Sequence, residues 1–293
     1  MNILTTIING LSLGGIYAMI SLGYTMVYGI AKMLNFAHGD IIMVGGYAIL
    51  VFMNMTGNPF LAVAASVVCC IILGILIEKT AYRPLRGASP LAVLITAIGV
   101  SYLLQSVFQM IFGSAKKMVN IANMGSVTIG SFTIQSQTLF TLATSIVVMV
   151  ALTLFVKYTK TGRAMLAVSE DRGAANLMGI NVNKIISITF AIGSALAALA
   201  SLCYLLKAPS IYNTFGSMPG IKAFTAAVIG GIGSIPGAML GGILLGVIEA
   251  LCNTKALAPI LGPYTIAIEF AVLIVILLVK PAGLLGKARR EKV

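Results

Sequence analysis

Few residues of this chain could do chemistry inside its long apolar stretches, and the first group is a short polar cluster. Asn35, His38, Gly39 and Asp40 open the second apolar stretch, as Asn-Phe-Ala-His-Gly-Asp. Exposed backbone N–H groups at such a helix end can line a translocation pathway, as interrupted helices do in transporters. In the alternative interpretation, Asn35 caps the helix and the other polar groups only solvate a membrane interface.

Two acids, Glu249 and Glu269, lie inside later apolar stretches. Ionisable groups within a membrane segment are costly, so they point to function by default. Each lies within about two or three turns of the end of its stretch, and the alternative is that it reaches the interface or caps a helix. We assign both acids, with the polar cluster of the second stretch, to a candidate translocation pathway. We find no intramembrane Lys or Arg placed to pair with them.

A polar segment, residues 157–184, holds seven of the 26 charged residues. Its sequence predicts a helix over 163–178, because that stretch lacks Pro and is followed by Gly179, where a left-handed helix cap belongs. One apolar stripe on this helix would contain Ala164, Met165, Ala167, Val168, Ala175 and Met178. Such a helix either rests on lipid headgroups or docks into the groove of a partner protein.

A glycine-rich segment contains Gly230, Gly231, Gly233, Ser234 and Gly237. It lacks the Gly-Lys-Ser/Thr of a phosphate-binding loop, so it predicts no nucleotide site. We expect instead a tight turn between two helices, with glycines that permit close packing. The sequence shows no nucleophile elbow, no metal-ligand cluster and no paired carboxylates at catalytic spacing, and we therefore assign no catalytic and no metal-binding residue.

The elements that carry these residues are membrane helices. The chain is 59% hydrophobic and only 9% charged, with a mean hydropathy of +1.05, whereas soluble proteins carry about 25% charged residues. Since lipid tolerates no unpaired backbone, we predict an all-α polytopic membrane protein. The net charge of +12 does not indicate nucleic-acid binding, because the basic residues lie at the ends of apolar stretches.

Nine apolar stretches can be placed, which predicts about eight or nine transmembrane helices in a single domain, residues 1–293. They are 5–29, 36–53, 60–77, 91–112, 139–156, 185–206, 221–234, 237–252 and 263–280. The seventh and eighth are short, so 221–252 is either two spans or a broken, re-entrant pair. Residues 113–138 form the one sizeable outer loop, with a short hairpin.

The positions of the basic residues predict the orientation. With the N-terminus outside, 14 of the 19 basic residues fall on inner segments, and five fall on outer ones: Lys116, Lys117, Lys207, Lys222 and Lys255. Because basic loops stay in the cytoplasm, we predict that the C-terminus and the polar segment 157–184 are cytoplasmic. The protein would be a multi-pass protein of the cell (inner) membrane.

Three of these motifs together resemble the permease subunits of branched-chain amino acid ABC importers, of the LivH type. The resemblance covers nearly the full length. It rests on Asn35-Phe36-Ala37-His38-Gly39 with Met43 and Gly45-Gly46-Tyr47, on Gly162-Arg163-Ala164 through Glu170-Asp171 to Ala174-Ala175 and Gly179-Ile180, and on Gly230-Gly231-Ile232-Gly233-Ser234 with Gly237.

The resemblance implies that the polar segment is a coupling helix that rests in a cleft on an ATPase subunit. The residues that match the coupling motif are Arg163, Glu170, Asp171, Ala174, Ala175 and Gly179. The chain departs from the wider motif of importer permeases at Gly173, where an acid is usual. Its own acids come earlier, at Glu170 and Asp171.

The resemblance also implies partners and a mechanism. A binding protein would deliver leucine, isoleucine or valine to the outer face. Two ATP-binding subunits would hydrolyse ATP, and a second permease chain, or a second copy of this one, would complete the pathway. This chain would bind no cofactor, would not be an enzyme, and would contact membrane lipid. Related permeases serve urea, amides and other amino acids. The rival from a different class is an ion-coupled secondary transporter.

Overall fold

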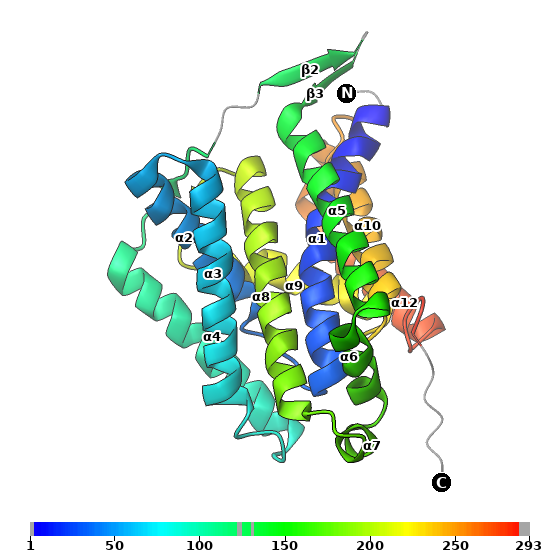
Figure 1. Ribbon diagram of the computed structural model, residues 1–293. Coiled ribbons are helices and arrows are strands. Elements are labelled where there is room, and N and C mark those ends of the chain that lie inside the picture. The colour runs from blue at the N-terminus through cyan, green and yellow to red at the C-terminus, as the bar shows by residue number, and fades with distance from the viewer. Residues whose placement is uncertain (1–2, 122–124, 130–131, 287–293) are drawn as a thin grey trace.

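The computed structural model describes residues 3–121, 125–129 and 132–286, which form a bundle of long helices with a small hairpin at one end (Figure 1). Within this part of the chain, eight helical stretches are long and apolar enough to cross a membrane. The predicted all-α polytopic membrane fold is therefore confirmed, and every predicted stretch except the seventh matches its helix to within a few residues.

The long helices are joined by short strands and turns. In chain order the elements are α1 (Ile3–Ala31), α2 (His38–Thr56), α3 (Pro59–Ile77), the π-helical η1 (Glu78–Tyr82), α4 (Pro90–Phe112), β1 (Lys117–Met118), β2 (Ser126–Ile129), β3 (Phe132–Gln135), α5 (Ser136–Tyr158), α6 (Lys160–Glu170), α7 (Arg172–Leu177), α8 (Val182–Lys207), β4 (Ser210–Ile211), α9 (Ser217–Gly230), α10 (Ile235–Cys252), α11 (Ala258–Leu261), the 3-10 turn η2 (Gly262–Tyr264) and α12 (Thr265–Val279). Strand β1 pairs antiparallel with β4, and β2 with β3, which is the hairpin predicted within 113–138.

Local sequence explains where several helices begin. The Asn58 side chain accepts a hydrogen bond from the Phe60 N–H at 3.0 Å, and Pro59 is the first residue of α3. Ser89 and Pro90 start α4 in the same way. A side-chain oxygen at the cap satisfies a free backbone donor, and proline lacks the donor that the first turn would leave unpaired.

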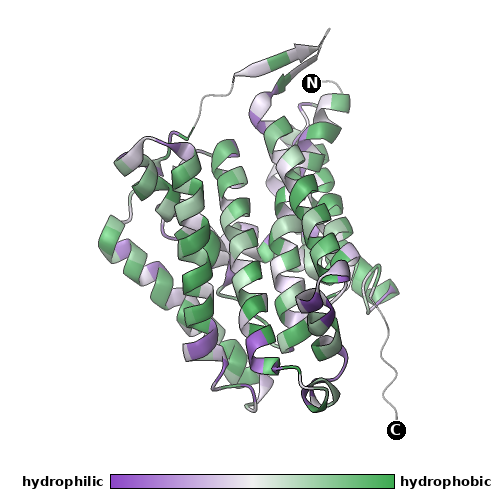
Figure 2. Ribbon diagram, in the orientation of Figure 1, coloured by the Kyte–Doolittle hydropathy of each residue, from purple (hydrophilic) through white to green (hydrophobic). Residues whose placement is uncertain are grey.

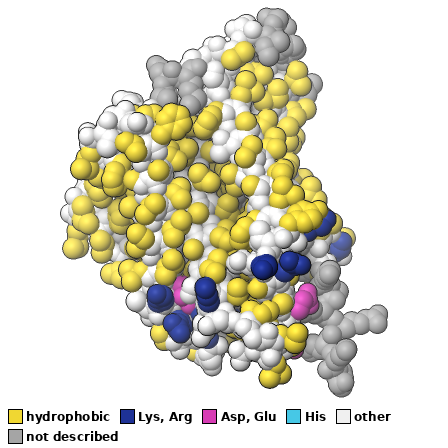
Figure 3. Space-filling model, in the orientation of Figure 1, with side chains coloured by type: hydrophobic (Ala, Val, Ile, Leu, Met, Phe, Trp, Pro, Cys, Tyr) yellow, Lys and Arg dark blue, Asp and Glu magenta, His cyan; other side chains and the backbone are white. Residues whose placement is uncertain are grey.

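The burial of the helices shows which of them form the centre. Most residues of α1 and α8 are buried, whereas α4 and α12 present most of their residues outward. Hydrophobic residues predominate along the middle of the bundle (Figure 2), and many large apolar side chains of α4 and α12 are exposed, which suits contact with lipid. Figure 3 shows Lys and Arg side chains gathered at the end of the molecule that carries α6 and α7, beyond this apolar belt. We call this end the α6/α7 face, and the opposite end, with β2 and β3, the hairpin face.

The seventh predicted stretch is not a full span. Helix α9 covers only 14 residues, Ser217–Gly230, about 21 Å at 1.5 Å per residue. The preceding chain turns into the bundle without forming helix, and Gly216 packs directly against the Gly39 backbone. Of the two alternatives for residues 221–252, the structure therefore shows a broken pair: a half-length α9 packed against a full-length α10.

Helix α2 also begins inside the bundle. The His38 ring lies 4.8 Å from the Tyr24 ring, centroid to centroid, and Tyr24 lies seven residues before the end of α1, about 10 Å along its axis. From this level α2 runs toward the hairpin face, while α9 starts beside it and runs toward the α6/α7 face. Two helix N-termini, each with a partial positive charge, thus meet within the bundle.

Candidate functional site

The polar segment 157–184 forms two helices and not the single helix predicted over 163–178. Helix α6 ends at Glu170, and Asp171 adopts an extended conformation with φ −148° and ψ 114°. The Asp171 carboxylate accepts hydrogen bonds from the N–H groups of Gly173 at 2.7 Å and Ala174 at 3.0 Å. Asp171 therefore caps a new helix, α7, because its side chain competes with continuation of α6. The predicted left-handed end at Gly179 is present, with φ +81°.

The apolar stripe of this segment packs against the bundle. Met165 and Val168 are buried, and α6 contacts α1, α5 and α8. These side chains are therefore not free to enter a lipid surface, which removes the main reason to treat the segment as an interfacial helix. Met178 was wrongly placed on the stripe: it is 83% exposed, and its neighbour Leu177 is 90% exposed. Both lie past the Asp171 break, which turns the end of α7 away from the bundle.

The two alanines of the coupling motif have different surroundings. Ala175 is 4% exposed and anchors α7, whereas Ala174 is exposed. Glu170 and Gly173 are also exposed. The end of the molecule therefore presents small, charged and large apolar groups together over one turn of helix. Exposed apolar groups of this kind mark a protein contact more often than a solvated surface.

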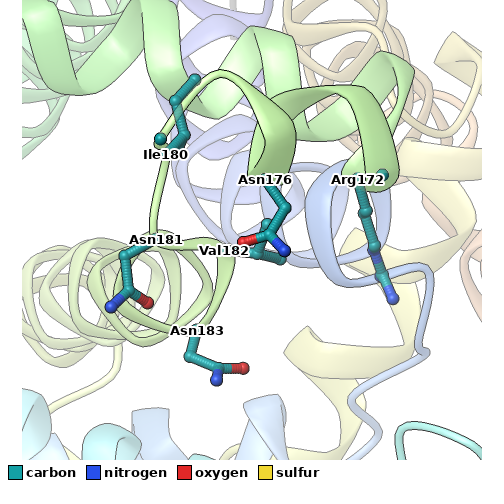
Figure 4. A pocket seen from close by; sticks show the side chains of 8 residues that line it. Arg172, Asn176, Ile180, Asn181, Val182 and Asn183 are labelled. Atoms are coloured by element: carbon teal, nitrogen blue, oxygen red, sulfur yellow. The ribbon is translucent and has the colours of Figure 1, made fainter.

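A polar cavity of about 680 Å³ lies between α7 and the start of α8 (Figure 4). It is lined by Arg172, Gly173, Asn176, Gly179, Ile180, Asn181, Val182 and Asn183. The Asn181 and Asn183 side-chain oxygens already accept hydrogen bonds from Lys184 N–H and Arg86. The lining thus contains no acid and presents mainly hydrogen-bond donors.

Arg172 links this cavity to the bundle. Its guanidinium donates to the Ile30 carbonyl at 2.9 Å, in the last turn of α1, where helix carbonyls lack partners within the helix. Burial, together with the positive charge of Arg86, lowers the pKa of the Arg172 guanidinium. A movement of α7 would therefore displace the end of α1 and the segment that leads to α2.

The break at Asp171 can be tested on its own. Asp171→Ala removes the cap of α7, which should cost about 1 kcal/mol of local helix stability. We expect the Gly173 and Ala174 amides to exchange about fivefold faster with deuterated solvent. Glu170→Ala, which changes a neighbouring exposed acid without a capping bond, is the matched control. Equal exchange in the two variants would contradict the capping role.

The polar cluster at the start of α2 is buried at the meeting point of the half-helices. Asp40 accepts a hydrogen bond from the Gln105 side-chain amide at 2.8 Å, and the same amide nitrogen lies 3.4 Å from the Ser217 hydroxyl. The acid thus lies in the first turn of α2, where its charge offsets the positive helix end. Helices α2, α4 and α9 meet here through Asp40, Gln105 and Ser217.

Asn35 does not cap α2. The residue at the cap position is Ala37, which has no side-chain bond. The Asn35 side-chain oxygen instead accepts a hydrogen bond from the Tyr82 hydroxyl at 2.8 Å. The alternative interpretation of Asn35 as a helix cap is therefore wrong, because its buried side chain reaches the end of another helix and not its own.

The two intramembrane acids share a lysine partner that the sequence analysis missed. Lys222 Nζ lies 2.7 Å from Glu249 Oε2 and 3.2 Å from Glu269 Oε1. The Tyr17 hydroxyl donates to the same Glu249 oxygen at 2.7 Å. Lys222 was wrongly placed on an outer segment; it is only 8% exposed. The error follows from treating 221–234 as a span that begins at the membrane surface, whereas α9 begins inside the bundle.

The predicted pathway residues therefore do not form one cluster. Asp40 lies with Gln105 and Ser217, whereas Glu249 and Glu269 lie with Lys222 and Tyr17. The His38 ring packs against Tyr24, and Asn35 bonds to Tyr82. Helix α9 contributes to the Asp40 cluster through Ser217 at its start and to the Glu249–Glu269 cluster through Lys222, about one and a half turns further on. A shift of α9 would change both clusters together.

The glycine-rich segment forms the turn between α9 and α10. Gly231 and Gly233 have left-handed backbones, with φ +102° and +97°. A Cβ at Gly230 would lie 2.0 Å from the Gly237 carbonyl oxygen, so the helices touch through their backbones. Ser234 caps α10 by accepting a hydrogen bond from the Gly237 N–H at 3.2 Å. This geometry accounts for the motif as packing, without any ligand.

Comparison with known proteins identifies the family of this chain. The family described as "Branched-chain amino acid transport system / permease component" matches residues 6–277. The chain belongs to this permease family.

Individual relatives agree with the family match. The high-affinity branched-chain amino acid transport system permease protein BraD of Pseudomonas aeruginosa is 43% identical, over 99% of this chain and 98% of the relative. The corresponding protein LivH of Escherichia coli K12 is 43% identical, over 97% and 96%. Among solved structures, a chain of PsaBC from Streptococcus pneumoniae in complex with Fab aligns with 93% of this chain and 88% of its own, at 14% identity and a TM-score of 0.43, too low to show a shared fold.

Membership of the permease family makes the chain a multi-pass membrane transport component. Three residues of this permease that the geometry brings into its polar sites were not predicted as site residues from the sequence: Gln105, Arg172 and Lys222. Gln105 and Lys222 could have been noticed as polar groups inside apolar stretches, although their partners lie 65 and 27 residues away in the chain.

Proposed function

We propose that this permease is the transmembrane subunit of an ATP-driven importer that moves leucine, isoleucine or valine, delivered by an extracytoplasmic binding protein. One observation carries the proposal: the segment 157–184 buries its apolar stripe in the bundle yet exposes Ala174, Leu177 and Met178 at its tip. Such an exposed tip, held by Asp171 and Arg172, suits a docking surface on a partner that drives transport.

We propose the N-terminus on the outside and the α6/α7 face in the cytoplasm. The gathering of basic side chains at that face supports this orientation. The hairpin face carries Lys116, Lys117, Lys207 and Lys255, and the basic residues of the C-terminal tail, Lys287, Arg289, Arg290 and Lys292, lie outside the described residues.

The remaining partners follow from the proposed mechanism. Two ATP-binding subunits would dock at the α6/α7 face and hydrolyse ATP, so this chain would need no cofactor of its own. A second, related permease or a second copy of this chain would complete the translocation pathway. ATP-driven closure of the two subunits would push α7, and Arg172 would pass the movement to the end of α1.

One observation favours a second candidate function. The buried Lys222 and Glu269 form, with the half-buried Glu249, a charged cluster of the kind that proton- or ion-coupled carriers use. A related importer for urea, amides or other amino acids is a third candidate, because the binding protein would set the cargo.

Uptake into proteoliposomes separates these candidates. With the permease, the ATP-binding subunits, the second permease chain and the binding protein present, internal ATP should drive leucine uptake, and removal of ATP should reduce uptake to background. Valine, urea and short amides serve as competing cargos. Uptake by this chain alone, driven by a proton or sodium gradient, would overturn the proposal in favour of a secondary transporter.

A further inference from the structure

A cavity near the hairpin face reaches Glu249, the half-buried acid of α10. It has a volume of about 470 Å³ and lies between α1, α5, α10, strand β3 and the end of α8. Glu249 lines it, one turn before the end of α10. The other polar side chains that line it include Asn9, Gln135, Thr138, Lys207 and Asn253.

The cavity is lined by one acidic and one basic side chain. Glu249 and Lys207 are the charged residues of the lining, and the remaining polar groups are neutral amides and hydroxyls. Leu13, Ile134 and Ala250 add an apolar part to the same wall. A cavity with an anion, a cation and an apolar patch matches the three parts of an apolar α-amino acid: its ammonium, its carboxylate and its side chain.

One lysine is shared by the two acids of this cluster. Lys222 serves both Glu249 and Glu269, and Glu269 Oε2 is buried without a hydrogen-bond partner among the described residues. A buried carboxylate is stable only when paired and hydrogen-bonded. A cation arriving at Glu249 from the cavity would release Lys222 to pair fully with Glu269.

From these contacts we infer that the cavity binds a zwitterionic, apolar α-amino acid during transport, with its ammonium on Glu249 and its carboxylate on Lys207. In the empty cavity Lys207 and Lys222 balance Glu249 and Glu269, two charges against two. A bound zwitterion keeps this balance while its ammonium pairs with Glu249 and its carboxylate pairs with Lys207. This inference rests on the proposed function, since it places the cargo of that function at a site on this chain.

Binding of radiolabelled leucine to the purified permease complex, without the binding protein, tests this site. We expect Lys207→Gln and Glu249→Gln each to weaken leucine binding about tenfold or more, because each removes a charge-assisted hydrogen bond. Isoamylamine, which lacks the carboxylate, and 4-methylpentanoate, which lacks the ammonium, should each compete at least tenfold more weakly than leucine. Lys255→Gln, at an exposed lysine outside the lining, should bind leucine as the unchanged complex does.

The results distinguish a failure of the proposed binding site from a failure of the proposed transport function. Glu249→Gln also removes a member of the ion-paired cluster, whereas Lys207→Gln leaves Lys222, Glu249 and Glu269 in place, so thermal unfolding is measured for both variants. Unchanged leucine binding in Lys207→Gln, or equal competition by the two analogues, would overturn the inference. If those complexes still import leucine with ATP and the binding protein, the proposed function stands without the site. If the unchanged complex imports no leucine, the proposed function itself fails.

Discussion

Replacing Ala174 by arginine should abolish the association of the permease with its ATP-binding subunits and reduce ATP-driven uptake to background. Ala174 is exposed on α7, next to the exposed Leu177 and Met178. A long charged side chain at the centre of a docking surface blocks close approach, and residues at such positions carry about 2 kcal/mol or more of binding, which is over tenfold in affinity. Co-purification of the subunits from membranes measures the effect.

Two variants make this test specific. Ala256→Arg introduces the same side chain at an exposed position in the loop after α10, on the hairpin face, and should leave co-purification intact. Ala175→Arg should instead lower the yield of folded permease. Ala175 is the buried residue of α7, and overpacking destabilises a close-packed site. Normal co-purification with Ala174→Arg would show that α7 does not dock the partner.

Replacing Lys222 by methionine should destabilise the permease strongly. The change leaves the buried Glu269 and the half-buried Glu249 without the base that they share. Removing one partner of a buried ion pair costs about 3–5 kcal/mol, because the remaining charge is desolvated and unpaired. We expect a large loss of monodisperse protein in detergent and a lower thermal unfolding temperature.

A double variant separates charge from packing. Lys222→Met combined with Glu269→Gln removes one charge of each sign, and it should recover part of the lost stability because fewer unpaired charges remain buried. Lys255→Met, at an exposed lysine, should have little effect, as surface charges seldom contribute. Equal stability of Lys222→Met and Lys255→Met would mean that the buried cluster does not hold α9, α10 and α12 together.

The polar segment shows how far the sequence analysis could reach. Helix propensity, the position of Gly179 and the apolar spacing predicted a helical segment within a few residues of α6 and α7. The break at Asp171 was missed because helix propensity is compatible with either outcome, and the choice depends on whether the side chain caps the next turn. The same break decides that Met178 faces away from the bundle.

The sequence by itself determined the class of the protein, the number and approximate ends of most helices, and the motifs of the family. These follow from composition and from stretches of about 20 apolar residues, which report the solvent that surrounds each segment. Only the tertiary structure decided that α2 and α9 begin inside the bundle, and that Lys222 joins Glu249 and Glu269. The physical reason is that hydropathy measures how a segment suits lipid, whereas the partner of a buried charge depends on which helices, far apart in the chain, lie side by side.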